Sequence, residues 1–147
     1  MNLTKSLLLL IVITVSSIYS NTNSNSIEIE IDNLKSSKGS IRVSLYNKLS
    51  AEYFPSNSDK AFKIYKFGIL RKKSKFILKD VPFGEYAISI HHDEDGNNEL
   101  NTNWIGMPKE GLGASNNAKG SFGPPKYAQA MFRHTKNTKL SIELYYP

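Results

Sequence analysis

Residues 81–91, VPFGEYAISIH, decide the fold class of this chain. Pro82 and Gly84 form a corner, and from Tyr86 onward apolar residues alternate with small or polar ones, which is the pattern of a half-buried strand. A tyrosine two residues after a corner glycine can return its hydroxyl to the preceding backbone, as tyrosine corners do in β-sandwiches. The segment therefore predicts a corner and a strand of a β-sandwich.

Six other segments have the short apolar or alternating pattern of strands. They are residues 27–32, 41–46, 62–70, 75–79, 128–133 and 140–146. We expect the first two to form a hairpin, with Gly39 in its turn available for a positive φ, and a bulge near Lys66, where the alternation breaks. About seven short strands without a long helix predict an all-β fold, a single immunoglobulin-like or transthyretin-like β-sandwich over residues 27–147.

The N-terminal residues 1–20 have the layout of a secretory signal peptide, with Lys5 before an apolar run and a small, polar end at Ser20. Residues 21–26, rich in Asn and Ser, then form a linker. A signal peptide predicts export, so the protein is expected to be periplasmic or secreted. Cleavage after Ser20 would leave no membrane span. A retained signal-anchor is the alternative. The chain has no cysteine, so core burial must hold the domain together without disulfides.

Basic residues exceed acidic ones, and the formal net charge is +6, of which Lys5 contributes one. The densest basic cluster, Arg71, Lys72, Lys73 and Lys75, falls where a turn between strands is expected. We interpret it as a solvated turn rather than a nucleic-acid surface, and nucleic acid is not an expected partner of an exported protein. A positive balance favours anionic surfaces more generally.

The segment 91–125 is a long connection without a sustained period of 2 or 3.6, so neither strand nor helix is predicted in it. It holds the only tryptophan of the chain. Connections of this length are uncommon in compact domains unless they are functional or disordered. Apolar residues spaced along it are expected to anchor it to the sandwich as one ordered loop; they are Trp104, Ile105, Met107, Leu112 and Phe122.

The start of this loop matches the calcium-loop template D-x-[DN]-x-[DN]-G. Its ligand positions 1, 3, 5, 7 and 9 are taken by Asp93, Asp95, Asn97, Glu99 and Asn101. Asn98 replaces the usual glycine, and asparagine tolerates the left-handed conformation. Trp104 stands where the bidentate glutamate of position 12 is expected, so Glu110 is the nearest residue that can complete the shell.

Two interpretations of residues 93–101 compete. The first is a calcium site, with an affinity on the order of 10⁻⁴ to 10⁻³ M because it has few carboxylates. The second is a metal-free Asx turn held by side-chain to backbone hydrogen bonds, which the same composition favours. Ca²⁺ is the cofactor that the sequence favours, and another ion at these residues is a third alternative.

A second candidate site is an aromatic platform for a sugar ring. Its predicted ligand-binding residues are Trp104, Phe122 and Tyr127, together with Ser115, Asn116 and Asn117 as hydrogen-bonding groups, and Tyr46 is a further candidate wall. The simpler alternative is that Trp104 and Phe122 only plug the loop onto the sandwich.

His91 and His92 end a strand and are expected to face opposite sides of the sheet. His92, with Asp93 or Asp95 and with His134, is a candidate transition-metal site or acid–base pair. The alternative is that these histidines bond the backbone and hold the loop in place. The chain has no recognised catalytic motif, so we assign no catalytic residue and do not expect an enzyme.

An ordered string of motifs gives a family resemblance. It comprises VPFGEY (81–86), HDEDGN (92–97), NTN (101–103), GMPKEG (106–111), SNNA (115–118) and GSFGPP (120–125). In these motifs the chain resembles the bacterial exported family known as domain of unknown function 2141. The resemblance implies an extracytoplasmic β-sandwich with a long loop, and it implies no activity.

The sequence therefore favours a monomeric binding or interaction module of the bacterial cell envelope, whose loop 91–125 recognises a glycan, a peptide or a protein. One alternative is a small envelope enzyme that uses His92, Asp93, Asp95 and Glu110. Another is a structural part that docks on a second envelope protein through the loop or a free strand edge.

Overall fold

The computed structural model describes residues 25–71 and 75–147. The predicted signal peptide (1–20), most of the predicted linker (21–24) and Lys72 and Lys73 lie outside the described residues. Asn25 and Ser26, the last two linker residues, already accept backbone hydrogen bonds from Val81 (2.9 Å) and Thr138 (3.0 Å). Among the residues described, none belongs to a helix long and apolar enough to cross a membrane.

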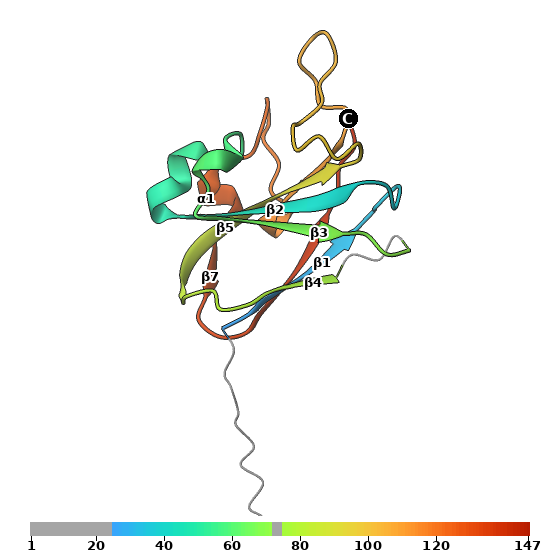
Figure 1. The fold of residues 1–147 in the computed structure, drawn as a ribbon. Helices are drawn as coiled ribbons and strands as arrows, with labels where there is room; N and C mark the ends of the chain where they lie inside the picture. The colour runs from blue at the N-terminus through green and yellow to red at the C-terminus, as the bar shows by residue number, and fades with distance from the viewer. Residues whose placement is uncertain (1–24, 72–74) are drawn as a thin grey trace, which may run out of the picture.

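Eight strands form two sheets in the described part of the chain, with four short helical turns (Figure 1). The strands are β1 (Ile27–Asp32), β2 (Ser40–Asn47), β3 (Lys63–Gly68), β4 (Lys75–Leu78), β5 (Gly84–Asp93), β6 (Gly111–Ala114), β7 (Phe132–His134) and β8 (Thr138–Glu143), and the turns are η1 (Lys48–Tyr53), η2 (Ser58–Lys60), η3 (Ser115–Asn117) and α1 (Tyr127–Ala130). One sheet has the order β4-β1-β8, and the other has the order β3-β2-β5-β6 with β7 also on β5. The predicted β-sandwich is confirmed.

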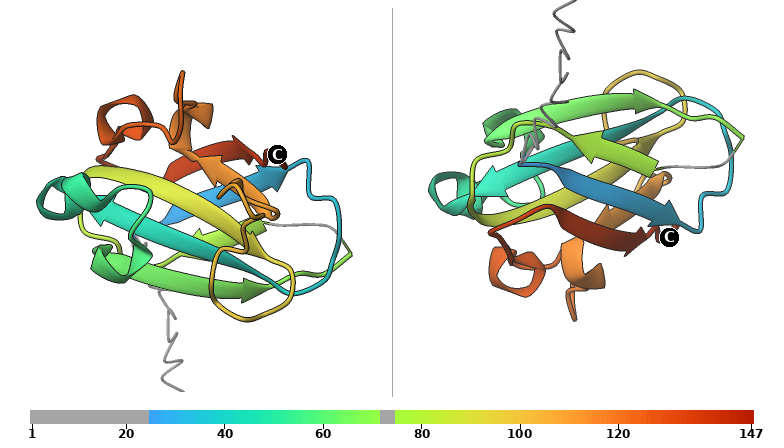
Figure 2. Two further views of the ribbon diagram at one scale, coloured as in Figure 1. Left: turned by 90° about the horizontal axis from the view of Figure 1, so that it is seen from above. Right: turned by 90° about the horizontal axis from the view of Figure 1, so that it is seen from below.

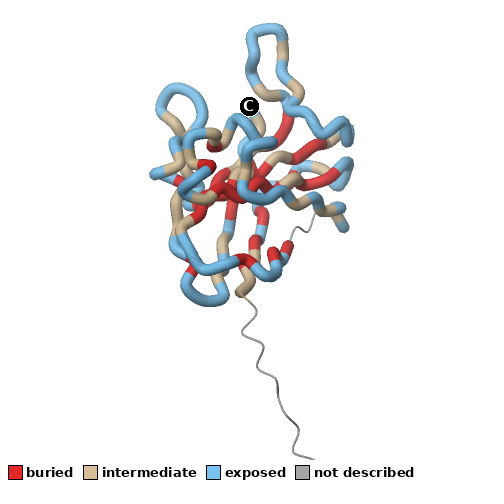
Figure 3. Tube along the Cα trace, turned by 60° about the vertical axis from the view of Figure 1, so that its left-hand side comes forward, coloured by how far each residue is buried: buried red, intermediate tan, exposed pale blue. Residues whose placement is uncertain are grey.

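The core lies between the two sheets, which Figure 2 shows as two layers. Alternate residues of each strand face it, as the sequence period requires. The aliphatic residues that the central strands bury in this core are Ile27, Ile29 and Ile31 in β1, Ile41, Val43 and Leu45 in β2, and Ile88 and Ile90 in β5. Figure 3 shows this buried interior beneath exposed connections.

The predicted hairpin of β1 and β2 is wrong. β1 pairs with β4 antiparallel and with β8 parallel, whereas β2 pairs with β3 and β5 in the other sheet. Both strands bury one face, but they bury it from opposite sides of the core, and alternation alone does not distinguish this arrangement from a hairpin. The positive φ predicted for Gly39 is confirmed at 66°.

Among the described strands β5 is the longest, and on the side away from β2 it pairs with two different strands. Its first half pairs with β7 and its second half with β6. The strand β6 lies inside the segment 91–125, so the prediction that this segment contains no strand is wrong. Its glycines hide the alternation: a Cβ on Gly111 would lie 2.6 Å from the Tyr146 ring, and one on Gly113 would lie 2.9 Å from Ile142.

Two smaller predictions also need correction. Residues 128–133 are not one strand but the end of α1 followed by most of β7. No bulge occurs at Lys66, because the register of β2 with β3 is continuous from Ser40 opposite Gly68 to Leu45 opposite Lys63. The basic segment after β3 leads from one sheet to the other, since β3 and β4 belong to different sheets.

The predicted tyrosine corner is present at the start of β5. The hydroxyl of Tyr86 donates a hydrogen bond to the Pro82 carbonyl over 2.9 Å, and the side chain is buried. Burial raises the pKa of the Tyr86 hydroxyl, so it stays a neutral donor at pH 7. This hydrogen bond fixes the direction of the chain where β5 begins.

Replacing Tyr86 by phenylalanine should lower the free energy of unfolding by about 1 kcal/mol, because one hydrogen bond is lost and the Pro82 carbonyl loses its donor. Urea unfolding at pH 7 measures this. Tyr145→Phe is the control, since Tyr145 is 57% exposed and its hydroxyl should contribute little. Equal losses for both variants would show that the corner bond is not what stabilises this end.

Candidate functional site

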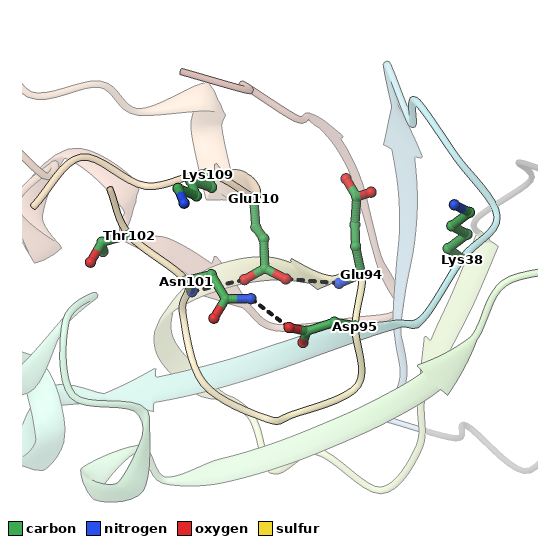
Figure 4. Close-up of a pocket in the computed structure, with 7 residues that line it drawn as sticks. All are labelled: Lys38, Glu94, Asp95, Asn101, Thr102, Lys109 and Glu110. Carbon is green, nitrogen blue, oxygen red and sulfur yellow. Dashed lines mark hydrogen bonds between the residues drawn. The ribbon is translucent and has the colours of Figure 1, made fainter. Parts of the chain in front are cut away.

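The end of β5 and the start of β6 enclose the clearest polar site of the described chain. The segment 94–110 connects these strands, and at its base lies an open hollow of about 430 Å³. Its lining is mostly charged or polar and consists of Lys38, Glu94, Asp95, Asn101, Thr102, Lys109 and Glu110 (Figure 4).

Glu110 closes the base of this loop. Its carboxylate accepts the backbone N–H groups of Glu94 (2.9 Å) and Asn101 (3.0 Å), and it pairs with Nε2 of His91 at 2.9 Å. Figure 4 shows the carboxylate between Glu94 and Asn101. Burial alone would raise the pKa of Glu110, but these three hydrogen bonds outweigh it and hold the pKa below its usual value. Glu110 is therefore a buried carboxylate that stays ionised at pH 7.

Asp93 holds the first turn of the loop. It is fully buried, and its two carboxylate oxygens accept the backbone N–H groups of Gly96 (2.9 Å) and Asn98 (3.1 Å). Asn98 has a φ of 65°, the left-handed conformation expected of it at the glycine position of the template. The turn is thus built as the sequence predicted.

Asp95 is the exposed carboxylate of the site. It accepts hydrogen bonds from the Asn101 amide (2.7 Å) and from the backbone and side chain of Asn97 (both 3.1 Å). The Asn101 bond, followed by the Asn97 bond, lowers the pKa of Asp95. Glu99 is exposed, and its backbone N–H donates to the Asn97 side chain over 2.7 Å. The predicted positions 3 to 9 therefore share one hydrogen-bonded turn.

Three of the predicted metal ligands converge. Asp93, Asp95 and Glu110 each place a carboxylate oxygen so that all three lie within 4.8 Å of one another. Glu110, the residue expected to stand in for position 12, is the last residue of the loop before β6. Asn97 and Asn101 lie beside Asp95 but direct amide nitrogen, not oxygen, toward it.

Lys66, Arg42 and His91 on the outer face of the sheet hold the loop down, and the sequence analysis did not predict the roles of Lys66 and Arg42. Lys66 lies 2.7 Å from the Asn98 side-chain oxygen and 3.9 Å from Asp93. Arg42 donates to the Asn98 carbonyl, and His91 pairs with Glu110. The period of two could have found His91, because it shares the outer face of β5 with Asp93.

The predicted aromatic anchors are wrong. Trp104 is 94% exposed and Phe122 is 103% exposed, while Ile105 and Met107 are also exposed. The strands already fill the core with their own side chains, and the loop is fixed by the polar contacts of Asp93 and Glu110. The apolar residues of its outer half are consequently directed into solvent.

Ser115, Asn116 and Asn117 have structural roles. Ser115 is fully buried where β5 changes partner, and its hydroxyl accepts the Ile88 N–H (2.9 Å) and donates to the Ala130 carbonyl. Asn116 donates to the Met131 carbonyl (2.9 Å), and Asn117 accepts the Glu143 N–H (2.8 Å). These bonds join η3 to β5, α1 and β8, and the side chain of Ser115 is not open to solvent.

The two tyrosines of the predicted platform also pack within the fold. Tyr46 is fully buried, so it forms no ligand wall. Tyr127 stacks edge-on against Phe54 at 6.1 Å, and its hydroxyl donates to the Glu85 carbonyl at 3.3 Å. Of the predicted platform residues, only Trp104 and Phe122 present their rings to solvent, and they do so from separate loops.

The buried histidines bond the backbone. His92 places its ring nitrogens 2.9 Å from the Lys38 carbonyl and 2.7 Å from the Tyr146 hydroxyl. His134, at the other end of β5, contacts the Val81 carbonyl (3.2 Å) and the Thr138 hydroxyl (2.7 Å). Both rings are fully buried and both nitrogens of each are engaged, so the geometry does not favour an acid–base pair between them.

Fold and site together define an open two-sheet β-sandwich whose β5–β6 loop is organised by buried carboxylates. The chain belongs to the bacterial family described as "Uncharacterized protein conserved in bacteria (DUF2141)", whose model matches residues 29–142. This match confirms the resemblance drawn from the sequence motifs. No curated protein and no solved structure matches the chain.

Proposed function

We propose that the protein is an exported binding module of the bacterial cell envelope whose loop 93–110 binds a calcium ion and presents the recognition surface. The observation that carries the cation site is the approach of the Asp93, Asp95 and Glu110 carboxylates to within 4.8 Å of one another. The apolar run before Ser16 supports export. The exposed outer half of the loop supports recognition.

The hydrogen bonds already made by these carboxylates are compatible with a bound ion. A carboxylate offers about four lone-pair sites, and Asp93 uses two of them for backbone N–H groups. The amides of Asn97 and Asn101 can turn their oxygens toward Asp95 by a rotation that exchanges oxygen and nitrogen, although the Asn97 rotation withdraws its oxygen from the Glu99 N–H. The site would then offer several oxygens from one turn, as calcium requires.

A buried hydroxyl beside Asp93 adds to this support. Ser40 lies directly opposite Asp93 in the β2–β5 register, so both side chains emerge on the same face of the sheet. Its oxygen is buried and has no hydrogen-bond partner within the described residues. A buried hydroxyl without a partner is costly, and a cation or a cation-bound water near Asp93 would satisfy it.

Two features limit the affinity. Lys66 lies 3.9 Å from Asp93 and competes for its charge, and both asparagine amides must turn before they can coordinate. A dissociation constant on the order of 10⁻⁴ to 10⁻³ M follows, as in extracellular calcium modules. The metal-free Asx turn is the competing description, and it predicts no response to calcium at all.

Calcium at about 5 mM, roughly ten times the midpoint of that range, should raise the melting temperature of the protein by several degrees, because an ion that binds only the folded state stabilises it. Asp95→Asn should abolish this rise. Asp95 is the variant of choice because it is exposed, so its loss should not unfold the turn. Thermal unfolding with and without the ion measures the effect.

Glu99→Gln is the matched control. Glu99 is an exposed carboxylate of the same turn, but its template position offers a backbone carbonyl rather than a side chain. The control should respond to calcium like the unchanged protein. A melting curve that calcium does not move, or an equal loss in both variants, would leave the metal-free turn as the correct description.

A further inference from the structure

The outer half of the β5–β6 loop is a small, hydrogen-bonded hairpin that projects from one end of the sandwich (Figure 1). A bridge joins Thr102 to Pro108, and the Lys109 N–H donates to the Asn101 carbonyl over 2.9 Å. We refer to residues 101–109 as the projecting hairpin. It rises above the body of the molecule and is exposed over most of its length (Figure 3).

The tip of the projecting hairpin is apolar and uncharged. Residues 102–108, TNWIGMP, contain no charged side chain, and Trp104, Ile105 and Met107 are 94%, 61% and 46% exposed. A convex apolar tip offers no pocket for a small ligand, because such ligands need concave sites. It is suited to enter another apolar medium.

Backbone N–H groups of the tip already make hydrogen bonds within the hairpin, which an apolar surrounding requires. The Asn103 N–H donates to the Met107 carbonyl (2.8 Å), and the Gly106 N–H donates to the Asn103 carbonyl (3.0 Å). The Asn103 side-chain oxygen accepts the N–H groups of Ile105 and Met107, each at 3.0 Å. Backbone groups that enter hydrocarbon must be satisfied internally, and these four N–H groups already are.

The charges near the tip are mixed, because Lys109 and Lys38 share the hollow with Glu94, Asp95 and Glu110. The chain as a whole is basic, with a net charge of +5 once Lys5 of the predicted signal peptide is left out, and this balance favours an anionic surface. Basic side chains near an anionic bilayer contribute about 1 kcal/mol each to attraction. A calcium ion at Asp93, Asp95 and Glu110 would offset the acidic groups at the base of the hairpin.

We propose that the projecting hairpin docks the protein on anionic lipid bilayers, with Trp104, Ile105 and Met107 inserted at the boundary between headgroups and acyl chains. Tryptophan favours this boundary because its ring is apolar and its N–H is polar. Docking rests on the proposed function as an exported binding module, but it does not require the cation site. A protein partner would instead need a pocket shaped for Trp104.

Trp104 is the only tryptophan of the chain, so its fluorescence reports on the tip directly. The protein, purified in the form the cell produces, is mixed with vesicles of phosphatidylglycerol and phosphatidylethanolamine. Its emission should shift to the blue, and brominated lipid should quench it. Phosphatidylcholine vesicles should give a weaker shift, since they lack the anionic charge. Unchanged emission with the anionic vesicles would overturn the proposal.

Sedimentation with the same vesicles tests the residues. Trp104→Ala and Ile105→Ser should each weaken binding about tenfold, because each removes apolar area from the tip. Leu49→Ala is the control: Leu49 is 88% exposed on η1, away from the hairpin, and its loss should leave binding unchanged. Equal losses in all three variants, or a blue shift only with extracted envelope proteins, would exclude lipid docking.

The same assay in the presence of a chelator, and with Asp95→Asn, separates the two proposals. Vesicle binding that persists without a calcium response in the melting curve supports docking and removes the cation site. A calcium response without any vesicle binding retains the cation site and removes docking.

Discussion

Replacing Glu110 by alanine is expected to lower the free energy of unfolding by about 3 kcal/mol at pH 7 and to abolish any response to calcium. Glu110 is 4% exposed, and its loss leaves two part-buried backbone N–H groups, of Glu94 and Asn101, without their acceptor. It also leaves Nε2 of His91 without its hydrogen-bond partner. Each orphaned buried group costs about 1–3 kcal/mol. Urea unfolding measures the loss.

The dependence of stability on acid pH is an independent test of the contribution of Glu110. Hydrogen bonds hold the pKa of Glu110 below its unfolded value, so the carboxylate contributes its stabilisation above the unfolded pKa. That contribution is lost as the pH falls through the lower folded pKa. The unchanged protein should therefore lose stability in acid more steeply than Glu110→Ala, and the two curves should converge at low pH.

Glu94→Ala is the matched control for Glu110. Glu94 lines the same hollow, but its side chain is 35% exposed and accepts a long hydrogen bond, from the Ser36 hydroxyl over 3.4 Å. The control should lose less than about 1 kcal/mol. If it loses as much as Glu110→Ala, the loop depends on the total charge of the hollow rather than on the hydrogen bonds of one carboxylate.

The alternation in the sequence predicted the strands well but not their partners. β1, β2 and β5 show the period of two, and each buries the face that the period selects. The pairing of β1 with β8 joins segments at opposite ends of the chain. No local pattern encodes that choice, because a buried face is equally satisfied from either side of a sandwich.

The missed strand β6 and the misread aromatics have a common cause. Sequence patterns register apolar side chains, whereas Gly111 and Gly113 pair in a sheet because they lack one and so admit Tyr146 and Ile142. Trp104 has the composition of an anchor but lies outside, because Glu110 and Asp93 already fix the loop through backbone groups. Polar anchoring leaves no hydrophobic signature in the sequence.

The template, in contrast, located the site with useful accuracy. It predicted that Asp93, Asp95 and Glu110 would lie together and that Asn98 would be left-handed, and both features are present, whereas the binding of an ion stays a prediction. The spacing of residues within a tight turn is local, so it can be predicted without knowing how the strands pair. The cations of β2 and β3 were not predicted, because their approach depends on the strand pairing.

Gly39→Ala is expected to prevent folding or to lower the free energy of unfolding by more than about 3 kcal/mol. A Cβ at this position would lie 1.9 Å from the Asp93 carbonyl oxygen and 2.7 Å from Glu94 backbone atoms. Backbone atoms cannot move aside as a flexible side chain can. Because Asp93 ends β5 and begins the acidic turn, the same contact should displace the Asp93 carboxylate from Asp95 and Glu110. Expression, far-ultraviolet circular dichroism and urea unfolding measure the outcome.

Gly96→Ala separates the contact from the backbone conformation. Gly96 also has a positive φ, 76°, but a Cβ there would meet nothing within 4 Å. The control should lose only the conformational preference of glycine, about 1 kcal/mol. Should both variants lose the same amount, the left-handed conformation alone would account for Gly39. A much larger loss at Gly39 would show that the approach of the β1–β2 connection to Asp93 is what joins the two sheets at the base of the loop.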